Sequence, residues 1–328
     1  MEFLGMKGKK VAIGVSSLFV LVLSCSGLTS CASKSKVIGI AWRADLDSEF
    51  YTNIVTAIKE AGGTPRLLGQ VTTTDVTYGT DNKLADVCVD ENGILKQSYA
   101  TSIRTNEWAH SNIKDVIGSI TTVVFTGGED ISPTLYATPE AWHGIEAEKD
   151  YNATRDVSDY LTMSYCVGKN LKLMGFCRGM QMLGVYSGAT VMQDIPTYFK
   201  AQGWTYNYEH RNEKVGDAYR DYAPHDVTVG DSSKLEKITG STLVEKAPSW
   251  HHQALLGVEG TKLTIDATND TEGHSMIEGI ERSDKTYQIG LQFHPEAALV
   301  KQLNKVANKD NFMSYDNALK FFKALVSD

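Results

Sequence analysis

The 328-residue sequence has few cysteines and none of the common metal-binding patterns. It holds five cysteines, and neither a C-x-x-C nor an H-E-x-x-H motif occurs. We therefore expect no disulfide framework, no metal site and no cofactor. The sequence also lacks a basic block, internal repeats and low-complexity tracts, and its 40 acidic residues outnumber its 32 basic ones. This balance argues against nucleic acid as a partner.

The first thirty residues have the pattern of an export signal. A lysine-rich stretch at residues 7–10 precedes an apolar run at residues 11–23, which is too short to span a bilayer comfortably. The sequence LTSC at residues 28–31 resembles a bacterial lipobox, in which Cys31 carries lipid after cleavage. Cys25 is a second candidate for lipidation, and a plain secreted protein is the alternative.

These features predict how the chain is divided. We expect residues 1–30 to be a lipoprotein signal peptide, residues 31–35 a short tether, and residues 36–328 a single domain long enough to bury a full core. Residues 70–110 are polar and break the rhythm of the fold, so we interpret them as an insertion. The predicted location is extracytoplasmic, anchored by lipid to a bacterial membrane. The sequence does not indicate the oligomeric state.

The order of apolar segments indicates an α/β fold. A strand at residues 36–42, a helix capped by Ser48 and a strand at residues 64–68 are typical of a parallel sheet. Further strands are expected at residues 121–126, 171–174, 189–196, 225–229 and 287–293, with helices at residues 153–167, 297–307 and 315–326. The pattern also predicts a hairpin that pairs residues 85–89 with residues 94–99, and a long loop at residues 197–224.

A cysteine stands where a strand turns into a helix. Cys177 follows the apolar run and precedes apolar residues at helical spacing, and Gly175 and Gly179 flank it where a sharp turn leaves no room for side chains. This is the nucleophile-elbow pattern of hydrolases, with sulfur in place of oxygen. The free N–H groups of a helix N-terminus favour the thiolate. The alternative is a buried, inert cysteine.

Two further segments can complete a catalytic site. Gly127 and Gly128 directly follow a buried strand, so their backbone N–H groups suit an oxyanion hole, although an ordinary glycine turn has the same sequence. His294 and Glu296 are two residues apart around a proline, and an extended backbone would place both side chains on one side. A carboxylate that orients an imidazole beside a thiol forms a Cys/His/Glu triad.

Together these segments resemble the class I glutamine amidotransferase fold, and within it the gamma-glutamyl hydrolase family. The resemblance spans most of the predicted mature chain and is carried by FTGGEDISPTLY (125–136), RD (155–156), GFCRGMQ (175–181), QDIP (193–196), HDVTV (225–229), SWHHQ (249–253) and GLQFHPE (290–296). It implies a flavodoxin-like three-layer sandwich with a mostly parallel central sheet.

The resemblance also implies roles for the matching residues. Cys177 would attack the γ-carbonyl of a glutamyl group, His294 would take and return the proton, and Glu296 would hold the imidazole. The N–H groups of Arg178 and Gly128 would bind the oxyanion. Substrate contacts would come from residues beside these groups, namely Gln181, Gly127, His251 and His252.

The main hypothesis is thus a membrane-tethered cysteine hydrolase of γ-glutamyl amides or peptides. One alternative is a glutaminase subunit that passes ammonia to a synthase, which export argues against. A second alternative is a non-catalytic lipoprotein that binds a glutamyl ligand. The leaving group of the substrate stays open.

Overall fold

The computed structural model describes residues 36–216 and 218–327. The predicted signal peptide and tether, with Cys31 and the alternative Cys25, lie outside these residues. Within the described part of the chain, no helix has the length and apolar character needed to cross a membrane. These described residues form one compact unit.

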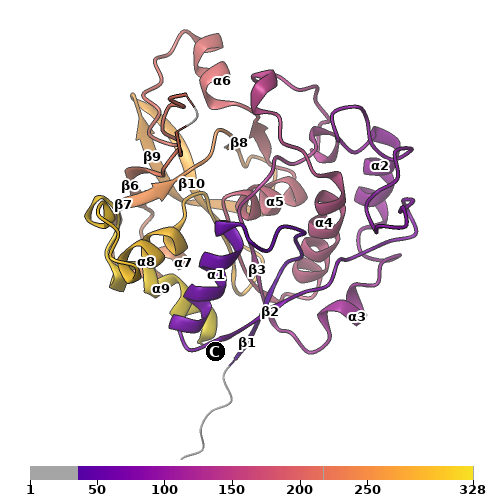
Figure 1. The fold of residues 1–328 in the computed structure, drawn as a ribbon, viewed down its shortest axis with the longest axis horizontal. Coiled ribbons are helices and arrows are strands. Elements are labelled where there is room, and N and C mark those ends of the chain that lie inside the picture. Colours follow the sequence, from indigo (N-terminus) through magenta and orange to yellow (C-terminus); the bar gives the residue numbers. More distant parts are fainter. Residues whose placement is uncertain (1–35, 217, 328) are drawn as a thin grey trace, which may run out of the picture. The chain divides into compact units, whose positions relative to one another are not determined.

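Five parallel strands form one side of a nine-stranded sheet (Figure 1). Their order is β2 (Thr64–Leu67), β1 (Val37–Ile40), β3 (Thr122–Phe125), β4 (Lys172–Phe176) and β11 (Gln288–Leu291). Numbered by their place in the chain, the strands run 2-1-3-4-5, which is the flavodoxin-like order. The carboxyl ends of β3 and β4 therefore lie side by side, and Gly127 and Cys177 follow those ends.

Antiparallel strands extend the sheet beyond β11. They are β10 (His274–Arg282), β9 (Leu263–Thr271), β6 (Ala223–Val229) and β7 (Leu243–Ser249). A separate two-stranded sheet pairs β5 (Thr190–Met192) with β8 (Ala254–Gly257). The sequence analysis predicts β6 but neither β9 nor β10, so it misses the longest part of this extension.

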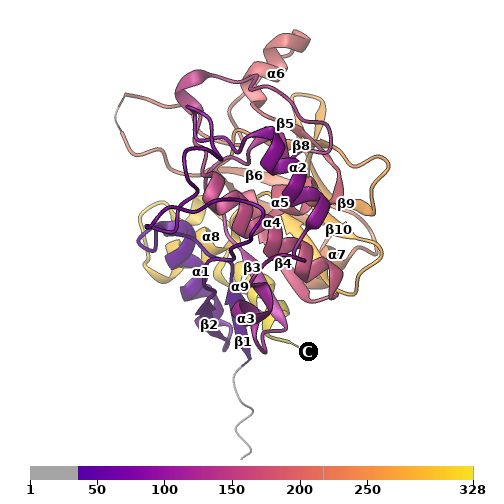
Figure 2. The same cartoon turned by 90° about the vertical axis from the view of Figure 1, so that its right-hand side faces the viewer.

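Helices cover both faces of the parallel strands (Figures 1 and 2). One face carries α1 (Glu49–Glu60), α8 (Pro295–Leu303) and α9 (Tyr315–Val326), and the other carries α2 (Gln97–Asn106), α4 (Ala153–Gly168) and α5 (Arg178–Ser187). Strand residues alternate between the two cores: Val123 and Phe125 pack on the α4 side, and Val124 packs on the α9 side. This confirms the predicted three-layer α/β fold.

The shorter helices are α3 (Ile113–Ile117), α6 (Ile195–Gln202), α7 (Lys234–Thr239), and the 3₁₀ turns η1 (Pro133–Leu135), η2 (Glu146–Glu148) and η3 (Lys309–Asn311).

The segment at residues 70–110 packs into the core instead of forming a hairpin. The predicted turn is present, since the Asp90 N–H donates to the Ile94 carbonyl at 2.9 Å, but only one bridge, Val89 to Leu95, follows it. The predicted second strand is wrong because α2 begins at Gln97. Helix formation buries Ala100 and Ile103 against the core, which two extended strands on the surface would not do.

The predicted loop at residues 197–224 is also partly helical. The strand before it ends at Met192, and Pro196 lies in the first turn of α6 rather than ending the strand. Proline is tolerated there because the first N–H groups of a helix need no intrahelical acceptor. The Asp194 side chain caps the helix by accepting from the Thr197 N–H at 3.1 Å.

Candidate active site

Cys177 occupies a strained turn between β4 and α5. Its φ is +50° and its ψ is −108°, a region that residues with a side chain rarely adopt and that is common at functional sites. A Cβ at Gly175 would lie 2.4 Å from the Gly179 backbone, and one at Gly179 would lie 2.5 Å from the Phe125 carbonyl. Both flanking glycines are therefore required by close backbone contact. The turn has the elbow geometry that the sequence predicts.

His294 and Glu296 form a short, buried pair. His294 Nδ1 lies 2.6 Å from a Glu296 carboxylate oxygen, and both side chains are shielded from solvent. The sequence argument for this contact is wrong in its geometry, because Pro295 starts α8 and Glu296 lies in its first turn. The carboxylate reaches back from the helix to the residue that precedes it. The His294 backbone N–H donates to the Pro248 carbonyl at 2.8 Å, which fixes this residue at the edge of the sheet.

The surroundings of His294 favour its charged form. Burial lowers the pKa of the ring, but the Glu296 carboxylate and the Cys177 sulfur outweigh burial and raise the pKa to about 10. The other ring nitrogen, Nε2, has no hydrogen bond of normal geometry. The ring lies against Gly127, where a Cβ would come within 2.9 Å of its Cε1 atom. An imidazolium paired with a thiolate is the arrangement of an activated cysteine.

The loop after β3 presents a backbone donor to the same place. The Gly127 carbonyl accepts hydrogen bonds from Arg155 Nη2 at 3.0 Å and from Arg43 Nη1 at 3.3 Å. Because the C=O and N–H of a trans peptide point in opposite directions, the Gly128 N–H points away from these arginines. Gly128 lines a pocket together with Cys177. Arg178 is the first residue of α5, so its N–H lacks an intrahelical acceptor and is also available.

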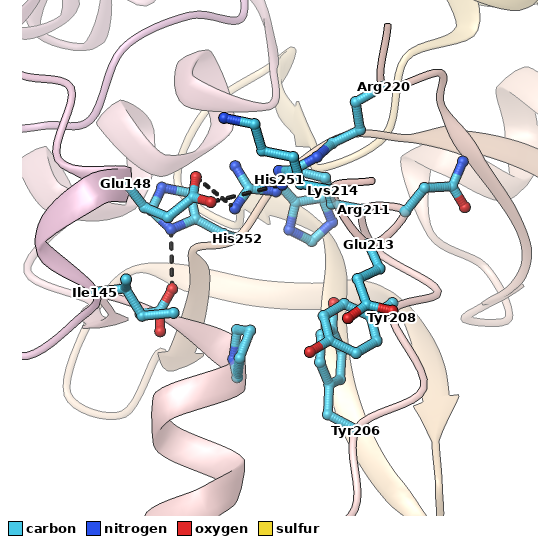
Figure 3. Close-up of a pocket in the computed structure, with 13 residues that line it drawn as sticks. Ile145, Glu148, Tyr206, Tyr208, Arg211, Glu213, Lys214, Arg220, His251 and His252 are labelled. Carbon is cyan, nitrogen blue, oxygen red and sulfur yellow. Dashed lines mark hydrogen bonds and ion pairs between the residues drawn. The ribbon is translucent and has the colours of Figure 1, made fainter. Parts of the chain in front are cut away.

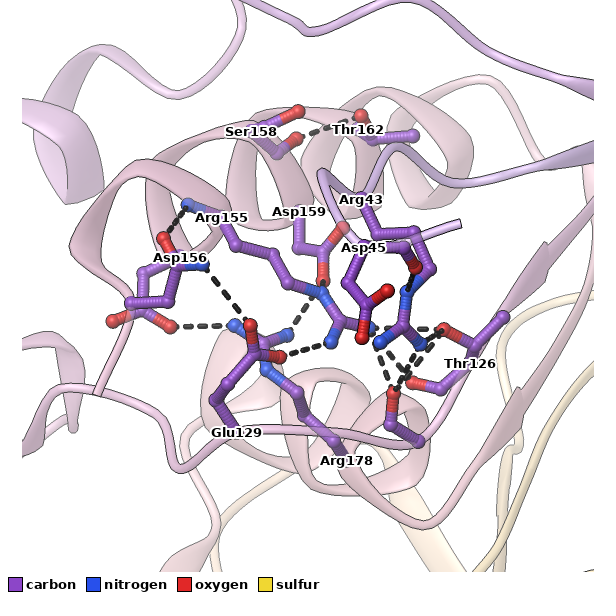
Figure 4. Close-up of polar contacts among 12 residues, drawn as sticks. Arg43, Asp45, Thr126, Glu129, Arg155, Asp156, Ser158, Asp159, Thr162 and Arg178 are labelled. Atoms are coloured by element: carbon purple, nitrogen blue, oxygen red, sulfur yellow. Dashed lines mark hydrogen bonds and ion pairs between the residues drawn. The ribbon is translucent and has the colours of Figure 1, made fainter. Parts of the chain in front are cut away.

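A buried network of charges fixes this loop to α4 and α5 (Figure 4). Arg178 contacts Asp156 at 2.6 Å and Asp159 at 2.5 Å. Arg155 contacts Asp159 at 3.3 Å and also binds Glu129, the residue after the glycine pair. Breaking a buried ion pair costs about 3–5 kcal/mol, so these contacts hold the loop firmly. Of this network, the sequence motifs include Glu129, Arg155, Asp156 and Arg178 but not Asp159. The spacing of Asp159, one turn after Arg155 on the same helix, could have indicated it.

The pocket at Cys177 has a volume of about 250 Å³ and is strongly polar. Its lining includes three of the predicted substrate residues, Gln181, His251 and His252, and four acidic residues, Glu129, Asp130, Glu148 and Asp150. The other lining residues are Gly128, Ala147, Lys149, Cys177, Arg211, Trp250 and Gln253. Gln181 donates to the Gln253 carbonyl at 3.2 Å. The structure thus brings Gln181, His251 and His252 to the same pocket as the nucleophile.

The two neighbouring histidines have different environments. His252 lies between two carboxylates, with Nδ1 3.1 Å from Asp194 and Nε2 3.0 Å from Asp130. Burial lowers the pKa of His252, but these two hydrogen bonds outweigh burial and raise it. Since both ring nitrogens face carboxylates, this position at the pocket wall favours the charged form of His252. His251 instead points its Nε2 atom away, toward Glu278.

A second pocket of about 180 Å³ shares four lining residues with the first (Figure 3). Its wall includes Tyr206 and Tyr208 and an ion pair between Glu148 and Arg211 at 3.0 Å. Glu148, Arg211, His251 and His252 line both pockets. A substrate bound at Cys177 thus has a second, partly aromatic space beside it.

The fold and the site define a hydrolase of the glutamine amidotransferase-like class. The chain belongs to the Peptidase C26 family, whose model matches residues 95–296. The matched range contains every predicted site residue except Cys31.

Curated relatives agree with this family. Over 181 residues the chain is 30% identical to the protein NtpR of Enterococcus hirae, covering 55% of this chain and 68% of that protein. It is 28% identical over 184 residues to a provisionally named glutamine amidotransferase of Schizosaccharomyces pombe, covering 55% of this chain and 63% of that protein. A protein of Mycobacterium tuberculosis with the same provisional name is 27% identical, with 53% of its length covered. The chain therefore spans roughly half to two thirds of these relatives.

Solved structures with low sequence identity are also similar in part. A glutamine amidotransferase from Thermotoga maritima has a TM-score of 0.44 and 15% identity, covering 89% of this chain and 94% of that one. The glutaminase domain of a Trypanosoma brucei CTPS with bound acivicin has a TM-score of 0.46 and 12% identity, covering 89% of this chain and 93% of that one.

Proposed function

We propose that the protein hydrolyses γ-glutamyl amide bonds through a γ-glutamyl thioester on Cys177. The observation that carries this proposal is the convergence of three elements around Cys177. The cysteine lies at a strained elbow, the buried ring of His294 interacts with both the Cys177 sulfur and the Glu296 carboxylate, and the Gly128 loop lines the same pocket as the cysteine. Each element performs one step of acyl transfer.

In the first half-reaction the Cys177 sulfur attacks the γ-carbonyl carbon and forms a C–S bond. The carbonyl oxygen becomes an oxyanion that the Gly128 and Arg178 N–H groups bind. When the C–N bond breaks, His294 gives its proton to the leaving amine. Each oxyanion donor contributes about 10²–10³ in rate, by analogy with other acyl-transfer sites.

In the second half-reaction a water molecule replaces the amine. His294, now neutral, takes a proton from the water, and the resulting hydroxide attacks the thioester carbon. The C–S bond breaks, glutamate leaves and the proton on His294 restores the starting pair with Cys177. Glu296 keeps Nδ1 protonated throughout, so that Nε2 exchanges the proton.

The charges around the pocket fit a glutamyl group, which carries an α-ammonium and an α-carboxylate. One oxygen of Asp130 is bonded to His252, and the other is buried without a partner, so it can accept from an α-ammonium. Arg211 lines the same pocket, and its guanidinium suits the α-carboxylate. The amide of Gln181 can complete the set.

The second candidate is a glutaminase that supplies ammonia to a partner enzyme. The names of several relatives favour it, because they describe glutamine amidotransferases or proteins like them. Both reactions use the same acyl-enzyme, so the leaving group separates them. A strong preference for substituted γ-glutamyl amides over glutamine supports the hydrolase, and the reverse preference supports the glutaminase. A purely ligand-binding protein would turn over neither.

The deciding experiment is mass spectrometry of the protein after mixing with a panel of γ-glutamyl amines, γ-glutamyl peptides and glutamine. The α-glutamyl isomers serve as matched control substrates, and Cys177→Ala serves as the matched variant. We expect a mass increase of one glutamyl group that maps to Cys177, with amine release that is lost in the variant. Turnover that survives in Cys177→Ala would show the nucleophile to be wrong. No adduct and no turnover with a reduced Cys177 would favour the binding protein.

We also propose that the chain is exported and tethered to a membrane by lipid on Cys31. The support is the sequence of residues 7–31 alone. Incorporation of labelled fatty acid, together with membrane fractionation, tests the tether against Cys31→Ala and Cys25→Ala. If the Cys31 variant keeps both the label and the membrane fraction, the assignment of this cysteine is wrong.

A further inference from the structure

Three histidines surround one glutamate beneath the candidate active site. Glu278, on β10, is fully buried, and its two oxygens face different histidines. His210 Nδ1 lies 3.1 Å and His251 Nε2 lies 3.7 Å from Oε1. His225 Nε2 lies 3.4 Å from Oε2. None of these groups takes part in the mechanism proposed above, although His251 also lines the catalytic pocket.

Hydrogen bonds on the far side of each ring fix where its proton sits. His251 Nδ1 lies 2.8 Å from the Gln253 carbonyl, and His225 Nδ1 lies 3.0 Å from the Glu209 carbonyl. A carbonyl can only accept, so both Nδ1 atoms carry the proton. In a neutral ring the other nitrogen, Nε2, is then a bare lone pair.

The same reasoning applies to His210 through a relay of two residues. The Thr271 hydroxyl donates to the Asn269 side-chain carbonyl at 2.7 Å. Its oxygen is therefore left to accept from His210 Nε2, which lies 2.7 Å away. Nδ1 of His210 is then the lone pair, and it faces Glu278.

Neutral rings thus direct their lone pairs at a carboxylate, with no donor between them. The facing atoms of His210, His225 and His251, and both oxygens of Glu278, have no hydrogen bond of normal geometry. Buried acceptors that face one another are unfavourable unless a positive charge lies between them. Water-exposed acidic clusters often need no ion, but this cluster is buried on all sides.

We propose that His210 Nδ1, His251 Nε2 and a Glu278 oxygen bind a divalent transition-metal ion of the zinc class. These atoms lie within 4.8 Å of one another. Tetrahedral zinc with bonds of about 2.0–2.1 Å separates its ligands by about 3.3 Å, which is close to the measured spacings. The outer hydrogen bonds to Gln253 and Thr271 are the kind that orient metal-ligating histidines. His225 would hold the second oxygen of Glu278.

The sequence gives no hint of this site, and the sequence analysis expects no metal. The ligands come from a loop, from the segment after β7 and from β10, so that no short motif contains two of them. The pairing of β7, β6, β9 and β10, together with the loop that carries His210, brings them together.

The test uses the full chain and Zn²⁺. The protein is stripped with a chelator, and binding is measured by competition with a chromophoric chelator, with metal content determined by mass spectrometry. Co²⁺ substitution gives a visible spectrum that reports nitrogen and oxygen ligation. We expect one Zn²⁺ per chain and a rise in Tm of at least about 3 °C on loading.

Variants distinguish this site from adventitious binding. Glu278→Gln removes the negative charge of one ligand and should weaken Zn²⁺ binding at least about tenfold, while Thr271→Val keeps every ligand and should weaken it about 10–100-fold. The exposed His110, bonded to Asp75, provides the control variant His110→Gln, which should bind normally. The Tm of each stripped variant shows whether it is folded. No stoichiometric binding by the wild type, or equal binding by folded Thr271→Val, would overturn the proposal and assign protons to the histidines instead.

Discussion

Replacing Glu296 with glutamine tests whether this carboxylate sets the charge of His294. The ordinary pKa of histidine is 6.5, and in the protein it is raised to about 10 although burial lowers it. A factor of ten in protonation is about 1.4 kcal/mol, so this interval corresponds to about 5 kcal/mol of preference for the charged ring. Glu296 is the largest favourable cause, and glutamine keeps the hydrogen-bond acceptor while removing the charge.

We expect Glu296→Gln to lower kcat about 10²–10⁴-fold, the usual contribution of a positioned acid and base. The pH profile is the sharper readout. In the wild type the alkaline limb of kcat/KM reports loss of the His294 proton and should lie near pH 10. In the variant this alkaline limb should move toward neutral pH by at least about two pH units.

Folding stability gives an independent check. The folded wild type keeps the His294 proton up to about pH 10, whereas the unfolded chain releases it near pH 6.5. The free energy of unfolding should therefore fall as pH rises through this window, with a slope of up to about 1.4 kcal/mol per pH unit. The variant should lose most of this slope. Glu60→Gln, an exposed glutamate bonded to Tyr315, is the matched control. An unchanged alkaline limb in a folded Glu296→Gln protein would refute the reasoning.

Two further changes test the oxyanion loop and an isolated buried acid. Gly128→Ala should lower kcat about 10²–10³-fold, because φ is +141° and a Cβ would lie 2.1 Å from Arg155 Nη1. Gly62→Ala, also at positive φ but in open space, is its control in kinetics and thermal unfolding, and equal kcat losses would contradict the prediction. Burial and Glu281 raise the pKa of Asp266 to about 8, so the folded state keeps a proton that the unfolded chain releases near pH 3.8. Stability should fall as pH rises from about 4 to 8, and Asp266→Asn should remove this fall; a Tm series at pH 5 and 8 that is the same for both proteins would contradict it.

The parts of the site that the sequence predicts are those set by local backbone geometry. A sharp strand-to-helix turn requires glycine on both sides of Cys177, and Gly175 and Gly179 meet this requirement within a short segment of the sequence. The glycine pair at 127–128 likewise follows its strand directly. Parallel strands then bring the two turns together, because their carboxyl ends meet at one edge of the sheet. The local sequence pattern and the order of the strands therefore suffice to predict that these two turns lie next to each other.

The parts that the sequence does not predict depend on contacts between distant segments. The first residues of α2 fall within the predicted strand at residues 94–99, because so short an apolar run fits either pattern and core packing decides the outcome. Strands β9 and β10 carry polar and charged residues such as Asp266 and Glu278 on buried faces, which hides their alternation. When a buried polar side chain interacts with residues far along the chain, its burial cannot be inferred from its neighbours in the sequence.

The antiparallel extension nevertheless belongs to the site, because one carbonyl links it to the catalytic pocket. The Gln253 carbonyl accepts from His251 at 2.8 Å and from Gln181 at 3.2 Å, which occupies both of its lone pairs. His251 is held by the cluster around Glu278, whereas Gln181 lies on α5 one turn after Cys177. The position of Gln253 is therefore set from two sides. A change at Glu278 that lets His251 turn would free this carbonyl and alter the hydrogen bonding of Gln181 beside the nucleophile.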